Sequence, residues 1–227
     1  MDIQEEIRAA FERLSAEQRA SLLASLRGFE EKYPGVAEPR AVYKTARHSP
    51  MTVEEYLKFD EESRIRHEYV AGEIFAMCGS TVRHGVIAGN LVRTIGNKLH
   101  GGPCRVFFSD YKVRLRVDRD DVFYYPDVAV SCDTRDLSAA YLPDPKLIIE
   151  VLSPSTEATD RREKAMNYRQ ILSLDEYAVV AQRSPEVTIY RRADRWAPEI
   201  LSEVGAVAEF RSIELRLPLA QIYADAL

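Results

Sequence analysis

Apolar residues recur every three or four positions over residues 82–100, the spacing that places them on one face of a helix. Residues 101–103 (Gly-Gly-Pro) follow directly, a combination that ends helices. A shorter helix is expected over residues 52–63, because Thr52 is a suitable N-cap and two glutamates follow in the first turn. The expected inner face of the long helix consists of Val86, Ile87, Asn90, Leu91, Thr94, Ile95 and Leu99.

Other segments have the patterns of strands. Residues 105–117 alternate between apolar and basic side chains in their second half, and 122–132 form a second strand that Pro126 interrupts. Residues 146–153 are almost continuously apolar, as in a central strand buried on both faces. Further strands are expected on either side of Gly72 and in EYAVVAQ, VTIYRR, EILSEV and VAEFRSI, before a closing helix at 218–225. The pattern predicts an α/β (α+β) fold, a mixed β-sheet flanked by helices.

The first 50 residues differ from the rest. Residues 1–33 show helical spacing in two short segments, and the second opens with the capping-box sequence S-A-E-Q. Residues 34–50 contain three prolines and little periodicity, so we interpret them as a linker. We therefore expect an N-terminal helical extension and linker, residues 1–50, and a main domain, residues 51–227. The extension serves oligomerisation or partner contact, or it simply packs on the main domain.

Two carboxylates occupy positions where a core is expected. Glu150 lies inside the apolar run of residues 147–152. Burying a charged carboxylate there costs on the order of several kcal/mol unless a positively charged group lies beside it. Asp127 follows Pro126 in another apolar segment, which places that strand at an edge or a bulge. Acidic side chains on neighbouring strands are suitable ligands for Mg²⁺, which prefers one or two carboxylates together with waters and phosphate.

A basic residue follows on a predicted helix, residues 160–173. With Asp160 as N-cap, Asp160, Lys164 and Tyr168 share one face, and Tyr168 is expected to pack there. Arg161, Arg162 and Lys164 crowd the positive end of the helix dipole, which is unfavourable unless that end binds an anion such as phosphate. The alternative is a solvated helix on which neighbouring acids balance the charge.

Composition narrows the class of protein. The net charge of −5 argues against a protein that coats nucleic acid by neutralising phosphates, although it allows a local basic cleft. Cys78, Cys104 and Cys132 are scattered and form no CxxC pair, so reduced thiols are expected. No apolar run has the length of a membrane span, and the charged start lacks the apolar core of a secretory signal. We therefore expect a cytoplasmic protein.

Several other motifs are weak. None of the four histidines stands four residues from another, so no HExxH-type zinc site is expected, and His84 fits a structural or a site role equally. Residues 153–156 contain two serines but no G-x-S-x-G elbow, so we interpret them as a loop. The arginines between 183 and 195 interleave with Tyr190 and Trp196, which fits nucleic-acid contact or a solvated strand face.

Five strings, in this order along the chain, resemble a known family. The strings TVEEYLKF, HEYVAGEIFAM, YYPDVAV and LIIEVLSPST, followed by DRREKAMNYRQ, are similar to the Uma-type restriction endonuclease family of the PD-(D/E)XK nuclease superfamily. The resemblance runs from about residue 52 to about residue 192. It implies a restriction-endonuclease-like fold and a hydrolase acting on phosphodiester bonds.

The resemblance also implies roles for individual residues. Asp127 and Glu150 correspond to metal ligands, joined by the backbone carbonyl of Val151, for Mg²⁺ with Mn²⁺ as a substitute. The usual superfamily lysine position is Leu152 here, and the family's lysine corresponds to Lys164. The supporting positions are Glu68, His84, Asp160 and Tyr168, and Arg161 and Arg162 are expected to bind substrate.

The expected function is metal-dependent endonuclease activity on DNA, with a possible homodimer because one metal site cuts one strand. A weak or inactive nuclease fold that serves as a nucleic-acid-binding or interaction module is the alternative. RNA or a structured intermediate remains open as substrate.

Overall fold

The computed structural model describes residues 50–227 except 78, 134, 135, 137, 143, 154–159 and 204. The chain separates into two compact units, Met1–Glu38 and Pro39–Leu227, and every described residue belongs to the second. The predicted N-terminal helices and linker lie outside the described residues, as does Cys78. In the part of the chain that is described, no helix is both long enough and apolar enough to cross a membrane.

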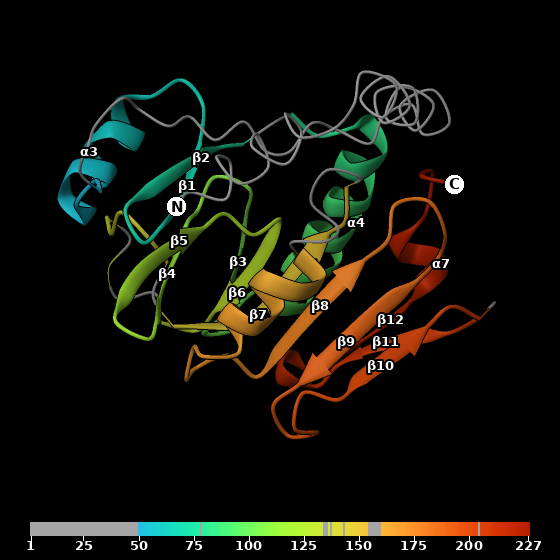
Figure 1. The fold of residues 1–227 in the computed structure, drawn as a ribbon. Coiled ribbons are helices and arrows are strands. Elements are labelled where there is room, and N and C mark those ends of the chain that lie inside the picture. The colour runs from blue at the N-terminus through green and yellow to red at the C-terminus, as the bar shows by residue number, and fades with distance from the viewer. Residues whose placement is uncertain are drawn as a thin grey trace, which may run out of the picture. The chain divides into compact units, whose positions relative to one another are not determined.

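A six-stranded mixed sheet forms the centre of the second unit (Figure 1). Its strand order is β10-β9-β8-β7-β6-β3, and the β7–β8 pair is parallel whereas the other pairs are antiparallel. The predicted buried run of residues 146–153 is confirmed as β7, near the middle of this sheet. The strands are β3 (Arg105–Phe108), β6 (Val128–Ser131), β7 (Pro145–Val151), β8 (Glu176–Val180), β9 (Val187–Arg191) and β10 (Pro198–Leu201).

A second sheet and a hairpin complete the strands. The four-stranded sheet has the order β2-β1-β5-β4 and is antiparallel throughout. Gly72 lies in the turn between β1 and β2 with φ +94°, a conformation that favours glycine, as the sequence predicts. The strands are β1 (His67–Val70), β2 (Glu73–Ala76), β4 (Val113–Val117) and β5 (Asp120–Tyr124), and the hairpin consists of β11 (Val207–Phe210) and β12 (Leu215–Pro218).

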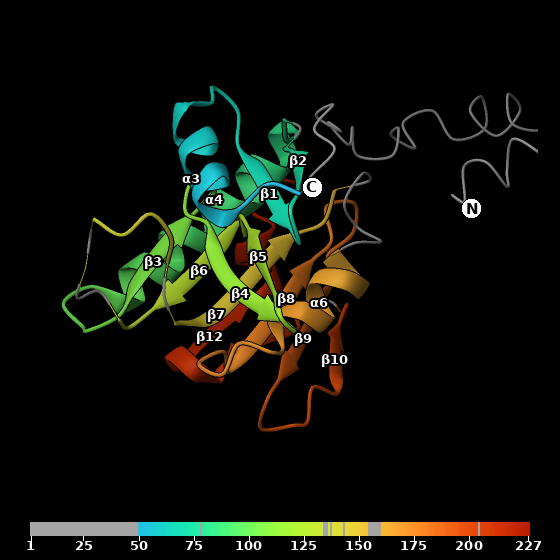
Figure 2. The same cartoon turned by 60° about the vertical axis from the view of Figure 1, so that its left-hand side comes forward.

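Helices cover both faces of the six-stranded sheet (Figures 1 and 2). On one face, Ile87, Leu91 and Ile95 of α4 (Val82–Leu99) pack with alternate residues of β6 to β9, with the hairpin and with α7 (Leu219–Ile222). On the other face, Ala165 and Tyr168 of α6 (Ala165–Tyr168) pack with the intervening residues of β7 and β8. The predictions for α4 and for α3 (Val53–Glu62), including Thr52 as N-cap, are confirmed, and Thr52 and Glu55 also form a capping box.

Three local predictions need correction. Residues 105–117 form two strands in different sheets rather than one, because residues 109–112 turn the chain between them. Pro126 lies in the connection from β5 to β6, and β6 is an interior strand, so Asp127 is at neither an edge nor a bulge. The predicted helix 160–173 begins as a π-helical turn, η1 (Asp160–Lys164), and ends at Tyr168, so Asp160 is not an N-cap. A short 3₁₀ turn, η2 (Arg211–Ile213), precedes β12.

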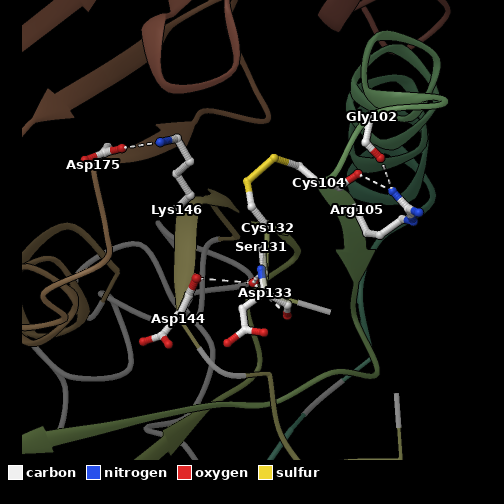
Figure 3. Close-up of a disulfide and its surroundings, with 9 residues drawn as sticks. All are labelled: Gly102, Cys104, Arg105, Ser131, Cys132, Asp133, Asp144, Lys146 and Asp175. Carbon is white, nitrogen blue, oxygen red and sulfur yellow. Dashed lines mark hydrogen bonds and ion pairs between the residues drawn. A yellow bond between two sulfur atoms is a disulfide. The ribbon is translucent and has the colours of Figure 1, made fainter. Parts of the chain in front are cut away.

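The prediction of reduced thiols is wrong for Cys104 and Cys132, which form a disulfide (Figure 3). The cause is the register of the sheet. Arg105 of β3 is opposite Ser131 of β6, so the residues just outside this pair face each other across the strands. The cysteines are 28 positions apart in the sequence, and only the strand pairing brings them together.

Candidate active site

Asp127 and Glu150 lie side by side where β6 begins and β7 ends. Val128 is opposite Ile149 in the antiparallel register, so the residue before Val128 lies beside the residue after Ile149. The Asp127 N–H donates to Glu150 Oε2 at 3.3 Å, and the Val151 N–H donates to Asp127 Oδ2 at 2.7 Å. The side chain of Asp127 is 17% exposed and that of Glu150 only 4%, so solvent reaches the pair from the Asp127 side.

Lys164 brings a buried ammonium group to the same place. Its Nζ atom lies 2.8 Å from Glu68 Oε1, 3.2 Å from Glu150 Oε1 and 3.3 Å from Asp160 Oδ1. Glu68 comes from β1, whereas Asp160 and Lys164 are the first and last residues of η1. Because Lys164 is 4% exposed, the alternative of a solvated helix is wrong at this position. π-Helical turns are frequent at functional sites.

These residues form an acidic cluster, which we define as Glu68, Asp127, Glu150 and Asp160 around Lys164. Burial raises the pKa of Glu150 well above its usual value. The Lys164 ammonium lowers this pKa, whereas the other three carboxylates of the cluster raise it further. Among the described residues, four carboxylates thus meet two basic side chains, those of Lys164 and His84. A cation bound beside Glu150 would favour the charged form of its carboxylate.

Tyrosines surround the buried half of the cluster. Tyr168 donates its hydroxyl hydrogen to Glu150 Oε1 at 3.1 Å, and Tyr177 donates to the backbone carbonyl of Asp160 at 2.8 Å. The ring of Tyr124 lies 5.3 Å from Lys164 Nζ, and its hydroxyl donates to Glu163 at 3.0 Å. Tyr168 was expected to pack within the helix, and it both packs and contacts a carboxylate of the cluster. These contacts fix the cluster against the sheet.

His84 contacts Asp127 at the exposed side of the cluster. Its Nε2 atom lies 2.9 Å from Asp127 Oδ1, and Gln182 Nε2 lies 3.4 Å from its Nδ1. Thr81, the N-cap of α4, donates to Gln182 Oε1 at 2.7 Å. Burial would lower the pKa of His84, but the hydrogen bond and the charge of Asp127 outweigh it and raise this pKa. Together with the Val151 N–H, His84 holds both oxygens of Asp127.

Most of the predicted site residues thus come together. Asp127, Glu150, Lys164, Glu68, Asp160, Tyr168, His84 and Val151 are linked by the contacts above. Arg162 is exposed, and the side chain of Arg161 lies outside the described residues, as do most of the residues of the predicted loop 153–156. Sequence reasoning missed Gln182, Thr81 and Tyr177. Tyr177 and Gln182 belong to the segment EYAVVAQ, which was predicted as a strand and lies beside β7, so that predicted strand was the available signal.

A second buried polar group was not predicted. Asp60, at the end of α3, is fully buried and accepts hydrogen bonds from the Lys112 ammonium at 2.5 Å, from the Tyr125 hydroxyl and from the His67 N–H at 2.9 Å. We call these four residues the Asp60 cluster. Burial alone would raise the pKa of Asp60, but the hydrogen bonds from Lys112 and Tyr125 outweigh burial and hold this pKa below its usual value.

The donor set of the acidic cluster fits a hard divalent cation. Within the described residues, no three side chains of His, Cys, Asp or Glu form a ready metal-binding group. Mg²⁺ needs fewer, because it is bound in many enzymes by one or two carboxylates with waters and substrate phosphate. Asp127 and Glu150 supply two adjacent carboxylates, whose oxygens retain lone pairs beyond the hydrogen bonds described.

Comparisons with known proteins identify the family and the fold of this chain. Residues 53–220 match the Uma2 family, described as "Putative restriction endonuclease". Two uncharacterized proteins of Synechocystis are similar: slr1290 is 37% identical over 78% of this chain and 96% of its own length, and sll1609 is 31% identical over 73% and 95%. The fold resembles the crystal structure of a putative nuclease belonging to DUF820 from Anabaena variabilis, with TM-score 0.64, 21% identity, and coverage of 78% of this chain and 100% of that chain.

Proposed function

The chain belongs to the Uma2 family, and we propose that it is a metal-dependent endonuclease that hydrolyses phosphodiester bonds in DNA. The observation that carries this proposal is the convergence of three separate motifs. Asp127 donates its N–H to Glu150, and Glu150 in turn accepts from Lys164, so the three candidate residues form one hydrogen-bonded chain. They come from a loop before β6, from β7 and from η1.

Asp127 and Glu150 would hold the metal ion, with the backbone carbonyl of Val151 as a third oxygen ligand. When bound, Mg²⁺ or Mn²⁺ supplies an activated water and offsets negative charge that develops on the phosphate. The exposed side of Asp127 is where a phosphate can approach, whereas Glu150 lies deeper and anchors the ion. The adjacency of these two carboxylates, one partly exposed and one buried, supports this assignment.

Lys164 would stabilise the charge that builds up on the phosphate and orient the attacking water. A buried ammonium acts more strongly than an exposed one because the surrounding dielectric constant is low. Its contacts with Glu68 and Asp160 hold it in place before substrate binds. Tyr168 and His84 serve as positioning residues, since each contacts a carboxylate rather than the site of reaction.

Substrate and assembly remain proposals. Arg162 is exposed beside the cluster and would contact a phosphate of the DNA backbone, together with Arg161. A homodimer would allow cleavage of both strands, and a cytoplasmic location is expected from the sequence. Sedimentation with and without DNA tests assembly, and a monomer under both conditions counts against the homodimer.

Cleavage of supercoiled plasmid and of single-stranded DNA, with Mg²⁺, Mn²⁺ or EDTA, tests the proposal. Wild type would be compared with Asp127→Asn, Glu150→Gln and Lys164→Gln, and with Glu73→Gln as an exposed control. We expect metal-dependent nicking by wild type and the control, and none by the three site variants that remain folded. A wild type that is inert on every nucleic acid with every metal contradicts the proposal.

The second candidate function is a binding module that keeps the nuclease fold without cleaving. It is favoured by the absence of a lysine two residues after Glu150, where Leu152 stands. Metal binding without any cleavage would support this candidate. If Lys164→Gln still cleaves DNA, the proposal of a nuclease stands and only the role assigned to Lys164 is wrong.

A further inference from the structure

Two large aromatic side chains are exposed, one at the end of β3 and one on the loop between β3 and β4. Phe108 is 53% exposed and Tyr111 is 49% exposed, although most aromatic residues of this domain are buried. The Tyr111 ring lies edge-on to that of Phe107, with 5.1 Å between the centroids. Exposing such surface has a cost of roughly 1.5–3 kcal/mol per side chain relative to full burial. Exposed aromatic side chains at this end of the sheet, next to the candidate site, are available for contact with a ligand.

This loop lies directly beside the acidic cluster. Phe108 is opposite Val128 in the β3–β6 register, and the Ser109 N–H donates to the backbone carbonyl of Asp127 at 3.3 Å. On its other side, Asp110 contacts Arg66, two residues before Glu68, at 3.4 Å. The loop thus touches both the segment that carries Asp127 and the segment that carries Glu68.

The aromatic residues are also held in place. Ser109 has φ +47°, a left-handed conformation that turns the chain sharply between Phe108 and Asp110. Lys112, the residue after Tyr111, is buried and donates to Asp60. Anchors on both sides of the loop leave little conformational entropy to lose when a ligand binds.

The two rings flank the end of the sheet. Phe107 packs with the core on the α6 side, the side on which Tyr168 contacts Glu150, and Tyr111 lies against Phe107. Phe108 points to the opposite side, which it shares with Val106, a residue that packs with the α4 core. Asp127 lies at this same end of the sheet, so the two exposed rings lie on either side of the strand end that leads to the candidate site.

We propose that Phe108 and Tyr111 each stack on an unpaired nucleobase, one on either side of the sheet end, so that this protein binds single-stranded or locally opened nucleic acid in preference to closed duplex. This inference rests on the proposed function, since it takes the acidic cluster as the place where the phosphate binds. Aromatic side chains stack on unpaired bases of any sequence, whereas the bases of a closed duplex already stack on each other.

Charge supports nucleobases as the ligand. A net charge of −5 provides little general attraction to phosphates, so a nucleic-acid ligand needs a source of affinity other than a basic surface. Stacking is such a source, because it contributes about 1–3 kcal/mol per base in proteins that bind single strands. The ligand class is therefore a polynucleotide with at least one unstacked base near the scissile phosphate.

Fluorescence anisotropy with a labelled single-stranded DNA and the matching duplex tests the inference, with Ca²⁺ in place of Mg²⁺ to limit cleavage. The variants are Phe108→Ala, Tyr111→Ala and the double variant. Phe108→Tyr and Tyr111→Phe keep the rings, and Leu172→Ala is a control that removes a side chain 91% exposed elsewhere. We expect each alanine variant to weaken single-strand binding about tenfold. Duplex binding, the ring-preserving variants and the control should be unchanged.

Equal single-strand affinity of the double alanine variant and wild type would overturn the inference. So would an equal loss for single strand and duplex, or a wild type that prefers duplex. Plasmid nicking by the same proteins separates the two proposals. If the alanine variants keep both metal-dependent nicking and single-strand binding, only the stacking proposal is refuted. If binding depends on the two rings but no protein cleaves DNA, only the nuclease proposal is refuted.

Discussion

The acidic cluster and the Asp60 cluster are both buried polar groups with a lysine, yet their charges differ. In the Asp60 cluster one carboxylate meets one ammonium and two further hydrogen-bond donors, and the pKa of Asp60 is lowered. In the acidic cluster, described carboxylates outnumber the basic groups, and the pKa of Glu150 is raised. Electrostatics therefore favours the charged carboxylate in one cluster and opposes it in the other.

This difference separates a structural role from a functional one. The balanced Asp60 cluster joins α3 to β1 and to the segments before β4 and after β5, and it stabilises the fold. In the acidic cluster, burial and the neighbouring carboxylates oppose the charge on Glu150, and hydrogen bonds from Tyr168 and from the Asp127 N–H hold its side chain in place. Residues that are unfavourable for stability are often retained for function. Neutralising one carboxylate should therefore reduce activity in the acidic cluster and the free energy of unfolding in the Asp60 cluster.

The largest effect is expected for Glu150→Gln, on catalysis. Removing a ligand of the proposed metal ion should lower kcat/KM for DNA by about a thousandfold or more, since such ions contribute several kcal/mol. The free energy of unfolding should not fall, because one of several crowded carboxylates is neutralised. Plasmid cleavage and urea unfolding measure the two quantities, and a strongly destabilised variant would contradict the comparison.

Asp60→Asn should have the reverse profile. Loss of the carboxylate leaves the Lys112 ammonium buried without its partner, which should lower the free energy of unfolding by about 3–5 kcal/mol. Glu61→Gln changes an exposed neighbour in the same helix and should leave stability unchanged. Urea unfolding at neutral pH gives both values. A variant as stable as wild type would show that the Asp60 cluster is not a stabilising network.

Lowering the pH should reduce the difference in unfolding free energy between wild type and Asp60→Asn. Because the pKa of Asp60 is lowered in the folded state, its contribution is present above its ordinary pKa of 3.8 and is lost as the pH falls through the lower folded pKa. Wild type and Asp60→Asn should therefore converge in stability below pH 3.8. Urea unfolding over a pH series measures this, and a gap that widens toward acid would show that the pKa is raised instead.

The smallest effect is expected for Tyr168→Phe, which removes one hydrogen bond to Glu150. A net loss of about 1 kcal/mol in transition-state stabilisation corresponds to a decrease in kcat of several-fold. Tyr177→Phe is the matched control, because its hydroxyl contacts only a backbone carbonyl near the cluster among the described contacts. Steady-state kinetics should show a decrease in kcat for the first variant and not for the second.

The parts of the fold that the sequence predicted carry strong local signals. The Thr52 cap, the apolar period of α4 and the apolar run of β7 each require only neighbouring residues. Asp127, Glu150 and Lys164 were found because a carboxylate in an apolar run and a crowded basic segment are locally unfavourable. Their convergence in the structure agrees with that reasoning, and their catalytic roles stay predictions.

The missed features depend on contacts between distant segments. Asp60 stands in an acidic helix and resembles a surface residue, and only the packing of Lys112, 52 positions later, shows that it is buried. Residues 105–117 have a strand pattern on both sides of the turn at 109–112. This pattern does not reveal that the two strands belong to different sheets. The disulfide depends on the β3–β6 register, which neither strand specifies alone.

The central claim is that the acidic cluster holds a divalent cation and the Asp60 cluster does not. Isothermal titration of Mn²⁺ into wild type, Asp127→Asn and Asp60→Asn tests this most directly, on samples shown to be folded. The account predicts saturable binding to wild type and Asp60→Asn and a large loss of affinity in Asp127→Asn. The account is contradicted if wild type binds no metal, or if Asp127→Asn binds as well as wild type.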